Sequence, residues 1–112
     1  MPEPQPAKYL RLHVGEDERW NGKPLYEAVV EKCRELEISG VSVFRGVEGF
    51  GESAEMHQSH LITRDRPILI SIVETEENLA RLLPEIEGIL DTAMMAISDV
   101  QMIRICKSTL PH

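Results

Sequence analysis

The run Ile68–Val73, ILISIV, decides the fold, because it is apolar at every position except Ser71. A strand with apolar side chains on both faces has to be covered on both faces in the folded protein. The run Tyr9–Val14, YLRLHV, instead alternates apolar and polar residues, and this period of two is typical of a strand with one apolar face. We therefore predict a strand in each run, and we expect Ile68–Val73 to be buried on both faces.

The segment that follows each of these strands has the apolar spacing of a helix. Pro24 is expected to open the first helix, where its missing N–H costs nothing, and Gly40 is expected to cap the C-terminal end. Thr75 is predicted to be the N-cap of the second helix. Pro84 lies inside that helix and should kink it, because proline removes one hydrogen bond.

Two further strands complete the pattern. They are VSVFR, Val41–Arg45, and VQMIRIC, Val100–Cys106, whereas Asp91–Ser98 fits either a loop or a short apolar crossing. The order is therefore βαββαβ. Right-handed crossovers of two such halves predict an α+β, ferredoxin-like fold, in which a four-stranded antiparallel sheet carries two helices on one face.

This fold leaves the other face of the sheet uncovered. The helix side should take Leu10, Leu12, Val14, Ile68, Ile70 and Ile72. The uncovered side should carry Tyr9, His13, Leu69, Val73 and Phe44. A mixed apolar face of this size is unfavourable on a monomer, so we predict a cyclic homo-oligomer with the open sheet faces turned inward.

The length of 112 residues fits one domain. We expect that domain at residues 8–107, between a flexible N-terminal tail at 1–7 and a C-terminal tail at 108–112. The net charge of −7 argues against nonspecific nucleic-acid binding and against docking on an anionic membrane.

No apolar run approaches the roughly 20 residues of a membrane helix, so direct membrane insertion is not expected. The opening MPEPQPA lacks the basic and apolar regions of a signal peptide. Cys33 and Cys106 are expected to be reduced, buried thiols. These features favour a cytoplasmic protein.

Three glycines, Gly46, Gly49 and Gly51, directly follow the strand Val41–Arg45. Their spacing matches neither a dinucleotide-binding loop nor a Walker A loop. Glycines allow positive φ and close backbone approach, which suits a bound anion and equally suits a strand that bends sharply into a loop. The spacing leaves both interpretations open.

His57 and His60 lie three residues apart, close to Met56. Two imidazoles can hold a transition metal, but nothing in the sequence fixes a third ligand. No pairing of Cys with His, or of Ser with His and Asp, indicates an activated nucleophile. We therefore expect no enzyme activity, and we keep a metal-binding protein as the alternative function.

The connection between the second and third predicted strands, residues 46–67, is far longer than the two to five residues that a hairpin needs. A connection of this length in a small domain is either functional or disordered. It carries both signs of charge and few apolar anchors, which is typical of a segment that becomes ordered when a ligand or partner binds.

Four segments together resemble a known family. They are LRLHVGEDERWNGKPLYEAVVEKCRE (Leu10–Glu35), GVSVFRGVEGFG (Gly40–Gly51), RPILISIVETEENLARLLPEI (Arg66–Ile86) and ISDVQMIRI (Ile97–Ile105). The most specific parts are GKPLYEA and RGVEGFG. The chain resembles the domain-of-unknown-function family numbered 190, whose members are PII-like signalling proteins. The resemblance implies a ferredoxin-like subunit of a homotrimer.

In PII-like proteins the long connection is the signalling loop, and adenine nucleotides bind between subunits at its base. The resemblance therefore implies a nucleotide near the base of the loop and a protein target, such as a membrane transporter or an enzyme, for the loop itself. The ligand-binding residues it implies are Arg45, Gly46, Glu48, Gly49, Phe50 and Gly51.

The sequence departs from the PII pattern at a second phosphate-binding loop. Residues 90–99 here read LDTAMMAISD, without Gly, Lys or Arg, and only Lys107 follows the last predicted strand as a basic residue. We therefore expect a less charged ligand than a triphosphate, such as a monophosphate. The predicted function is a noncatalytic regulator that senses an adenine nucleotide or similar small anion. The alternative is a cation-tolerance-like protein with His57 and His60 as ligands.

Overall fold

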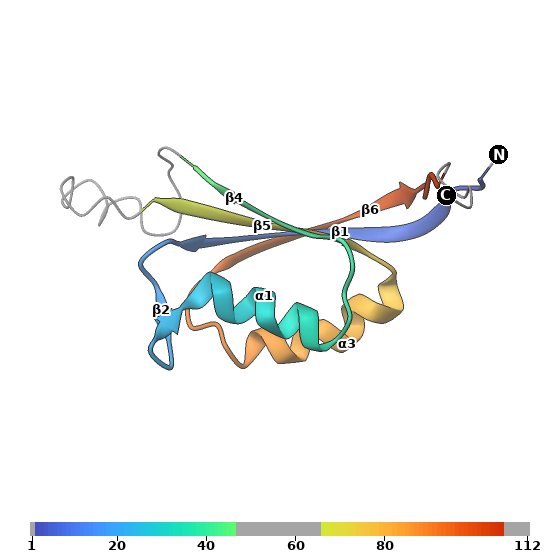
Figure 1. Ribbon diagram of the computed structural model, residues 1–112. Helices are drawn as coiled ribbons and strands as arrows, with labels where there is room; N and C mark the ends of the chain where they lie inside the picture. The colour runs from blue at the N-terminus through green and yellow to red at the C-terminus, as the bar shows by residue number, and fades with distance from the viewer. Residues whose placement is uncertain (1, 47–65, 107–112) are drawn as a thin grey trace, which may run out of the picture.

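The computed structural model describes residues 2–46 and 66–106. It shows two helices against one face of a four-stranded antiparallel sheet, which confirms the predicted ferredoxin-like α+β fold (Figure 1). The sheet has the strand order β4-β5-β1-β6. Its strands are β1 (Gln5–Gly15), β4 (Val41–Arg45), β5 (Pro67–Glu74) and β6 (Met94–Met102), its helices are α1 (Leu25–Glu35) and α3 (Glu76–Glu87), and a small hairpin consists of β2 (Arg19–Trp20) and β3 (Lys23–Pro24).

The centre of the sheet is the antiparallel pair of β1 and β5, in which Leu10 faces Ile72 and Leu12 faces Ile70. These four side chains are fully buried under the helices. All six residues predicted for the helix side are buried, which confirms the alternation read from the sequence. Buried residues of both helices complete the core: Leu25, Ala28, Val29 and Cys33 of α1, and Leu79, Leu82 and Ile86 of α3.

Helix α3 begins as predicted. The Thr75 hydroxyl accepts a hydrogen bond from the backbone N–H of Asn78 at 3.2 Å, which is the geometry of an N-cap. The helix then continues through Pro84 to Glu87.

Helix α1 ends earlier than predicted, at Glu35 rather than near Gly40. Glu37 has a φ of 60°, and the N–H groups of Glu37 and Ile38 donate to the carbonyls of Arg34 and Cys33. This is a Schellman motif, in which a left-handed residue closes the helix, and here the chain uses a glutamate instead of the usual glycine.

The last strand lies earlier in the chain than predicted, at Met94–Met102 instead of Val100–Cys106. The ambiguous segment is strand because it pairs with β1, from Met94 opposite His13 onward. The pairing stops at Met102 because its partner Gln5 is the first residue of β1. Strand β1 itself includes residues 5–7 of the expected N-terminal tail.

The two cysteines differ in environment. Cys33 is buried, and burial raises the pKa of its thiol to about 11, so it is protonated and unreactive at neutral pH. Cys106 is exposed, so the expectation that it is buried was wrong. The cause is that Cys106 follows the last paired residue of β6, at a place where the sheet offers no cover.

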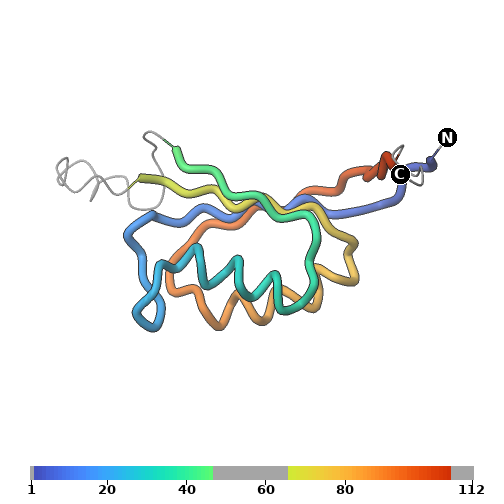
Figure 2. The backbone as a smooth tube through the Cα atoms, viewed as in Figure 1, coloured from blue at the N-terminus to red at the C-terminus, as the bar shows by residue number. Residues whose placement is uncertain are grey.

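The two ends of the sheet are formed by different pairs of strand ends. The start of β1 and the end of β6 lie together at one end, and the end of β4 and the start of β5 lie at the other (Figure 2). Among the described residues, no helix is long and apolar enough to cross a membrane. The end formed by β4 and β5 is where the predicted ligand residues begin.

Candidate functional site

Three chain segments come together at the end of the sheet where β4 stops. Gly15 of β1 is opposite Pro67 of β5, and Arg45 of β4 is opposite the next residue of β5. The N–H of Gly46 donates to the carbonyl of Pro67 at 2.7 Å, so the sheet pairing extends one residue past β4. The N–H of Glu16 donates to the carbonyl of Arg66 at 2.8 Å. Arg45 and Glu16 therefore lie at the ends of β4 and β1, on either side of β5, and both positions have a fixed backbone.

Arg45 and Glu16 form an ion pair across this end of the sheet. The Arg45 Nη2 atom lies 2.7 Å from the Glu16 Oε2 atom, and the side chains are 50% and 27% exposed. A guanidinium has five N–H donors, and one carboxylate cannot use them all. Arg45 is therefore a half-exposed cation that retains capacity to bind an anion.

Gly46 has a packing reason to be glycine. A Cβ atom at this position would lie 2.8 Å from the Cγ atom of Pro67, which is closer than real Cβ contacts. The glycine thus allows β4 and β5 to stay paired up to the point where the described chain stops. This favours the structural interpretation of Gly46 over direct ligand contact.

The remaining predicted residues lie outside the described part of the chain. These are Glu48, Gly49, Phe50 and Gly51 of the predicted ligand site, and His57 and His60 of the alternative metal site. Within residues 2–46 and 66–106, no group of three or more His, Cys, Asp or Glu residues could hold a metal ion. Of the predicted site, the structure therefore places Arg45 and Gly46.

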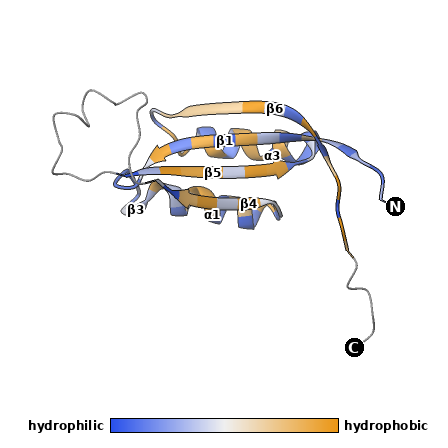
Figure 3. Ribbon diagram, turned by 90° about the horizontal axis from the view of Figure 1, so that it is seen from above, coloured by the Kyte–Doolittle hydropathy of each residue, from blue (hydrophilic) through white to orange (hydrophobic). Residues whose placement is uncertain are grey.

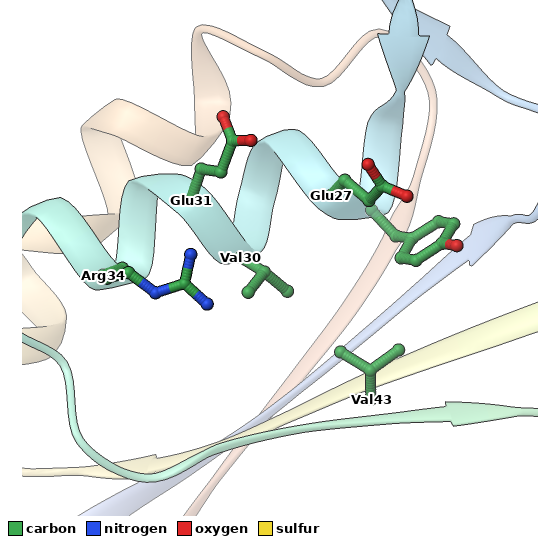
Figure 4. A pocket seen from close by; sticks show the side chains of 6 residues that line it. Glu27, Val30, Glu31, Arg34 and Val43 are labelled. Carbon is green, nitrogen blue, oxygen red and sulfur yellow. The ribbon is translucent and has the colours of Figure 1, made fainter.

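A groove that sequence reasoning missed lies between α1 and the edge strand β4. Its volume is about 290 Å³, and Figure 4 shows Val30 of the helix and Val43 of the strand facing each other across it. Charged residues stand along the helix side of the groove. The six lining residues are Tyr26, Glu27, Val30, Glu31, Arg34 and Val43.

The charges of the groove are partly satisfied within the chain. The Lys23 ammonium lies 2.5 Å from the Glu31 carboxylate and lowers the pKa of that group. The floor is apolar, and Val43 is 39% exposed. The sequence predicted a strand at Val41–Arg45 but gave no sign that its apolar Val43 would lie at a sheet edge. The arrangement suits an apolar side chain with a polar backbone beside it.

The face of the sheet away from the helices carries a mixture of apolar and polar side chains, and no helix of the described residues covers it. The register places Tyr9 opposite Val73 and Phe44 opposite Leu69 on this face, as predicted. Phe44 is 54% exposed. Figure 3 looks onto this side of the sheet, with the helices behind it.

Polar atoms at the centre of this open face are already paired. The Ser71 hydroxyl donates to the Tyr9 hydroxyl at 3.1 Å, and the Arg11 guanidinium lies 5.3 Å from the centre of the Tyr9 ring. These contacts link Tyr9 to both Ser71 and Arg11 on the open face. The face therefore has the character of a contact surface rather than of a pocket.

The buried carboxylate Glu74, at the end of β5, connects the segment between α1 and β4 to the start of α3. It is 5% exposed and accepts hydrogen bonds from Ser39, Thr75 and Asn78. Burial opposes its ionisation, but the hydrogen bonds outweigh burial and hold its pKa below the ordinary value. A carboxylate satisfied in this way has a structural role.

The comparisons with known proteins agree with this architecture. The family described as DUF190, Uncharacterized ACR, matches residues 7–102. A UPF0166 protein of Aquifex aeolicus (strain VF5) is 33% identical over 98 residues, which cover 86% of this chain and 92% of that protein. A UPF0166 protein of Methanocaldococcus jannaschii is 26% identical over 100 residues, which cover 88% and 93% of the two chains.

Solved structures similar to this chain include PII-like proteins. The apo form of CPII from Thiomonas intermedia K12, a nitrogen regulatory PII-like protein, has a TM-score of 0.65 at 16% identity and covers 94% of this chain and 100% of that chain. CPII bound to ADP, AMP and bicarbonate has a TM-score of 0.64 at 14% identity, over 89% and 98% of the two chains. A PII-like signaling protein from Thermus thermophilus has a TM-score of 0.63 at 14% identity, over 90% and 93%. At these identities the likeness shows the fold.

Proposed function

We propose that this chain, which belongs to the DUF190 family, is a noncatalytic PII-like regulator that senses an adenine nucleotide or a similar small anion. The fold supports a PII-like role, and the PII-like protein CPII has been solved with ADP and AMP bound. The one buried carboxylate among the described residues, Glu74, is saturated by hydrogen bonds and supports no catalytic task.

The observation that carries the proposal is the half-exposed Arg45 at the end of β4. Its guanidinium is held by Glu16 at the end of the sheet where the connection between β4 and β5 begins. Exposed ion pairs of this kind contribute only about 0–1 kcal/mol, so a phosphate can compete for the guanidinium. Arg45 binds the phosphate of the ligand in this proposal, and Glu48, Gly49, Phe50 and Gly51 complete the site.

The ligand is a weakly charged nucleotide, such as a monophosphate, rather than a triphosphate. Residues 90–99 contain no Gly, Lys or Arg, and most of them form β6 or lead into it. The Asp99 carboxylate in this stretch pairs with Lys8. The stretch therefore adds negative charge and no phosphate-binding group.

Assembly and relay complete the proposal. Three copies turn their open sheet faces inward, which buries Phe44 and its neighbours, and the nucleotide lies where two subunits meet. The connection between β4 and β5 signals to a protein target whether the nucleotide site is occupied. An example of such a target is the cytoplasmic surface of a membrane transporter.

Calorimetric titration of the purified full chain with AMP, ADP, ATP and cyclic nucleotides tests the proposal. We expect saturable binding of AMP or ADP, and we expect Arg45→Gln to weaken it at least tenfold. Arg19→Gln in the β2–β3 hairpin is the matched control and should bind like the wild type. Absence of binding for all these nucleotides would refute the nucleotide-sensing function.

A further inference from the structure

The groove between α1 and β4 is bordered by a strand edge that has no partner within the described chain. The strand order β4-β5-β1-β6 places β4 at the margin of the sheet, paired with β5 alone. The outer N–H and C=O groups of an edge strand readily accept another strand. A volume of about 290 Å³ is at the lower limit of small-molecule sites, and it is better suited to one or two side chains of an added strand.

The same chain carries a segment that fits this edge. Residues 103–106 follow β6 without a strand partner among the described residues, although their sequence alternates in the manner of a strand. Ile103 is 51% exposed and Ile105 is 69% exposed. Two β-branched residues at alternate positions with this exposure indicate a strand whose cover lies outside the chain.

The register of β6 decides which way these isoleucines face. Leu12 of the helix side is opposite Met95, and Leu10 is opposite Ile97. Side chains two residues apart share a face of a strand, so a continued β6 turns Ile103 and Ile105 to the helix side. If the open faces of all copies point inward, the helix sides point outward together, and Val43 also lies on that side.

We propose that the segment 103–106 of one copy adds as a strand to the β4 edge of a neighbouring copy and inserts Ile103 and Ile105 into the α1–β4 groove. The isoleucines pack on Val30, Val43 and the Tyr26 ring, and the strand backbone pairs with the free edge of β4. The groove is thus completed by the partner. The inference rests on the proposed assembly and adds to it a second, edge-to-edge contact.

Site-directed cross-linking between two distinguishable chains tests this contact. A tagged chain with Val43→Cys is co-expressed with an untagged chain with Ile105→Cys, both carrying Cys106→Ser, and is treated with a short bis-maleimide. Cys33 can stay, because its thiol is buried. Denaturing capture on the tag should then recover the untagged chain as a covalent dimer. Replacing Ile105→Cys with Ala80→Cys, at an exposed position of α3, should abolish that product.

A second variant reports on the isoleucines themselves. Ile105→Lys should lower the mass of the assembly measured by native mass spectrometry while the circular dichroism spectrum is unchanged, and Ile105→Leu should keep the wild-type mass. Oligomers without the Val43–Ile105 cross-link would overturn the edge contact and leave the nucleotide proposal intact. A monomeric wild-type protein would overturn both the contact and the proposed trimer, whereas nucleotide titration decides the sensing function separately.

Discussion

Glu74 is a buried carboxylate whose two oxygens divide four hydrogen bonds between them. One oxygen accepts from the N–H and hydroxyl of Ser39, and the other accepts from the N–H of Thr75 and the amide of Asn78. The carboxylate thereby links the segment before β4 to the start of α3. All four hydrogen bonds are donated to Glu74, so this position requires a group that only accepts. The ionised carboxylate is such a group, and it therefore contributes to the stability of the fold.

Glu74→Gln should lower the free energy of unfolding by about 2 kcal/mol at pH 7, because an amide leaves buried donors unsatisfied. Urea unfolding followed by circular dichroism measures this change. Glu87→Gln, at the exposed end of α3, is the control and should change stability by less than about 0.5 kcal/mol.

The same group predicts a pH dependence. Its pKa in the folded state is below the ordinary value of 4.5, so the stabilisation is fully present above that value and is lost as the pH falls through the folded pKa. The difference between wild type and Glu74→Gln should therefore shrink below about pH 4.5. A difference that stays constant down to about pH 2.5 would contradict the role assigned to the carboxylate.

Glu16 competes with the ligand for Arg45 if the proposed function is correct. Glu16→Gln removes the charge and keeps the size, so AMP affinity should rise about fivefold, equivalent to about 1 kcal/mol. Isothermal titration at constant salt concentration measures the effect. An unchanged or weaker affinity would show that the ion pair does not hold Arg45 away from the ligand.

At the scale of elements, the end of α1 is closed by a residue in a strained conformation. Glu37 has a φ of 60°, which costs a residue with a Cβ atom about 1 kcal/mol. Glu37→Gly should therefore raise the free energy of unfolding, measured in urea, by about that amount. Glu37→Ala is the matched control, since it removes the same side chain but keeps the Cβ atom, and it should give no stabilisation.

The joint between α1 and β5 depends on a close backbone approach at Gly40. The carbonyl of Gly40 accepts from the N–H of Val73 at 3.0 Å, and a Cβ atom at Gly40 would lie 2.5 Å from the Val73 carbonyl oxygen. Gly40→Ala should cost at least about 2 kcal/mol of stability in thermal or urea unfolding.

Gly88 offers the comparison for that prediction. It has a φ of −70°, and a Cβ atom there would lie 3.7 Å from its nearest neighbour. Gly88→Ala should be neutral or slightly stabilising. Equal effects of the two substitutions on stability would show that the close contact at Gly40 is not the cause of the stability loss in Gly40→Ala.

At the scale of the whole molecule, the sheet face away from the helices exposes apolar side chains such as Phe44 and Met94. Phe44→Asp places a charge on that face and should dissociate the assembly, because burial of a carboxylate there has no compensating partner. Light scattering after size exclusion measures the mass. Ala80→Asp, on an exposed position of α3, should keep the wild-type mass. An oligomer unchanged by Phe44→Asp would contradict assembly through the open face.

The sequence predicted the fold well where local patterns and burial agree. The alternation of Tyr9–Val14, the apolar run Ile68–Val73 and the Thr75 cap all have their predicted positions, because each depends on a period or a hydrogen bond within a few residues. The end of α1 was missed because a glutamate adopts the conformation usually left to glycine. The extent of β6 was missed because its pairing is set by where β1 begins.

The candidate site could be predicted only in part. The sequence marked Arg45 and Gly46 as ligand residues, and the structure adds that Arg45 is paired with Glu16 and that Gly46 is needed for contact with Pro67. Glu16 gave no signal, since it is 29 positions away in sequence (45 − 16 = 29) and meets Arg45 only because β1, β5 and β4 are neighbours. The groove at Val43 was missed for the same reason.

The sequence by itself determined the apolar residues of the main strands and helices and their βαββαβ order, because apolar periodicity is a local property of the chain. The sequence also identified the family, because four of its segments resemble that family. Only the tertiary structure decided which strands are edges, which carboxylate lies beside Arg45 and which apolar residues remain uncovered. Those properties depend on contacts between segments far apart in the chain, and no periodicity in one segment encodes the position of another.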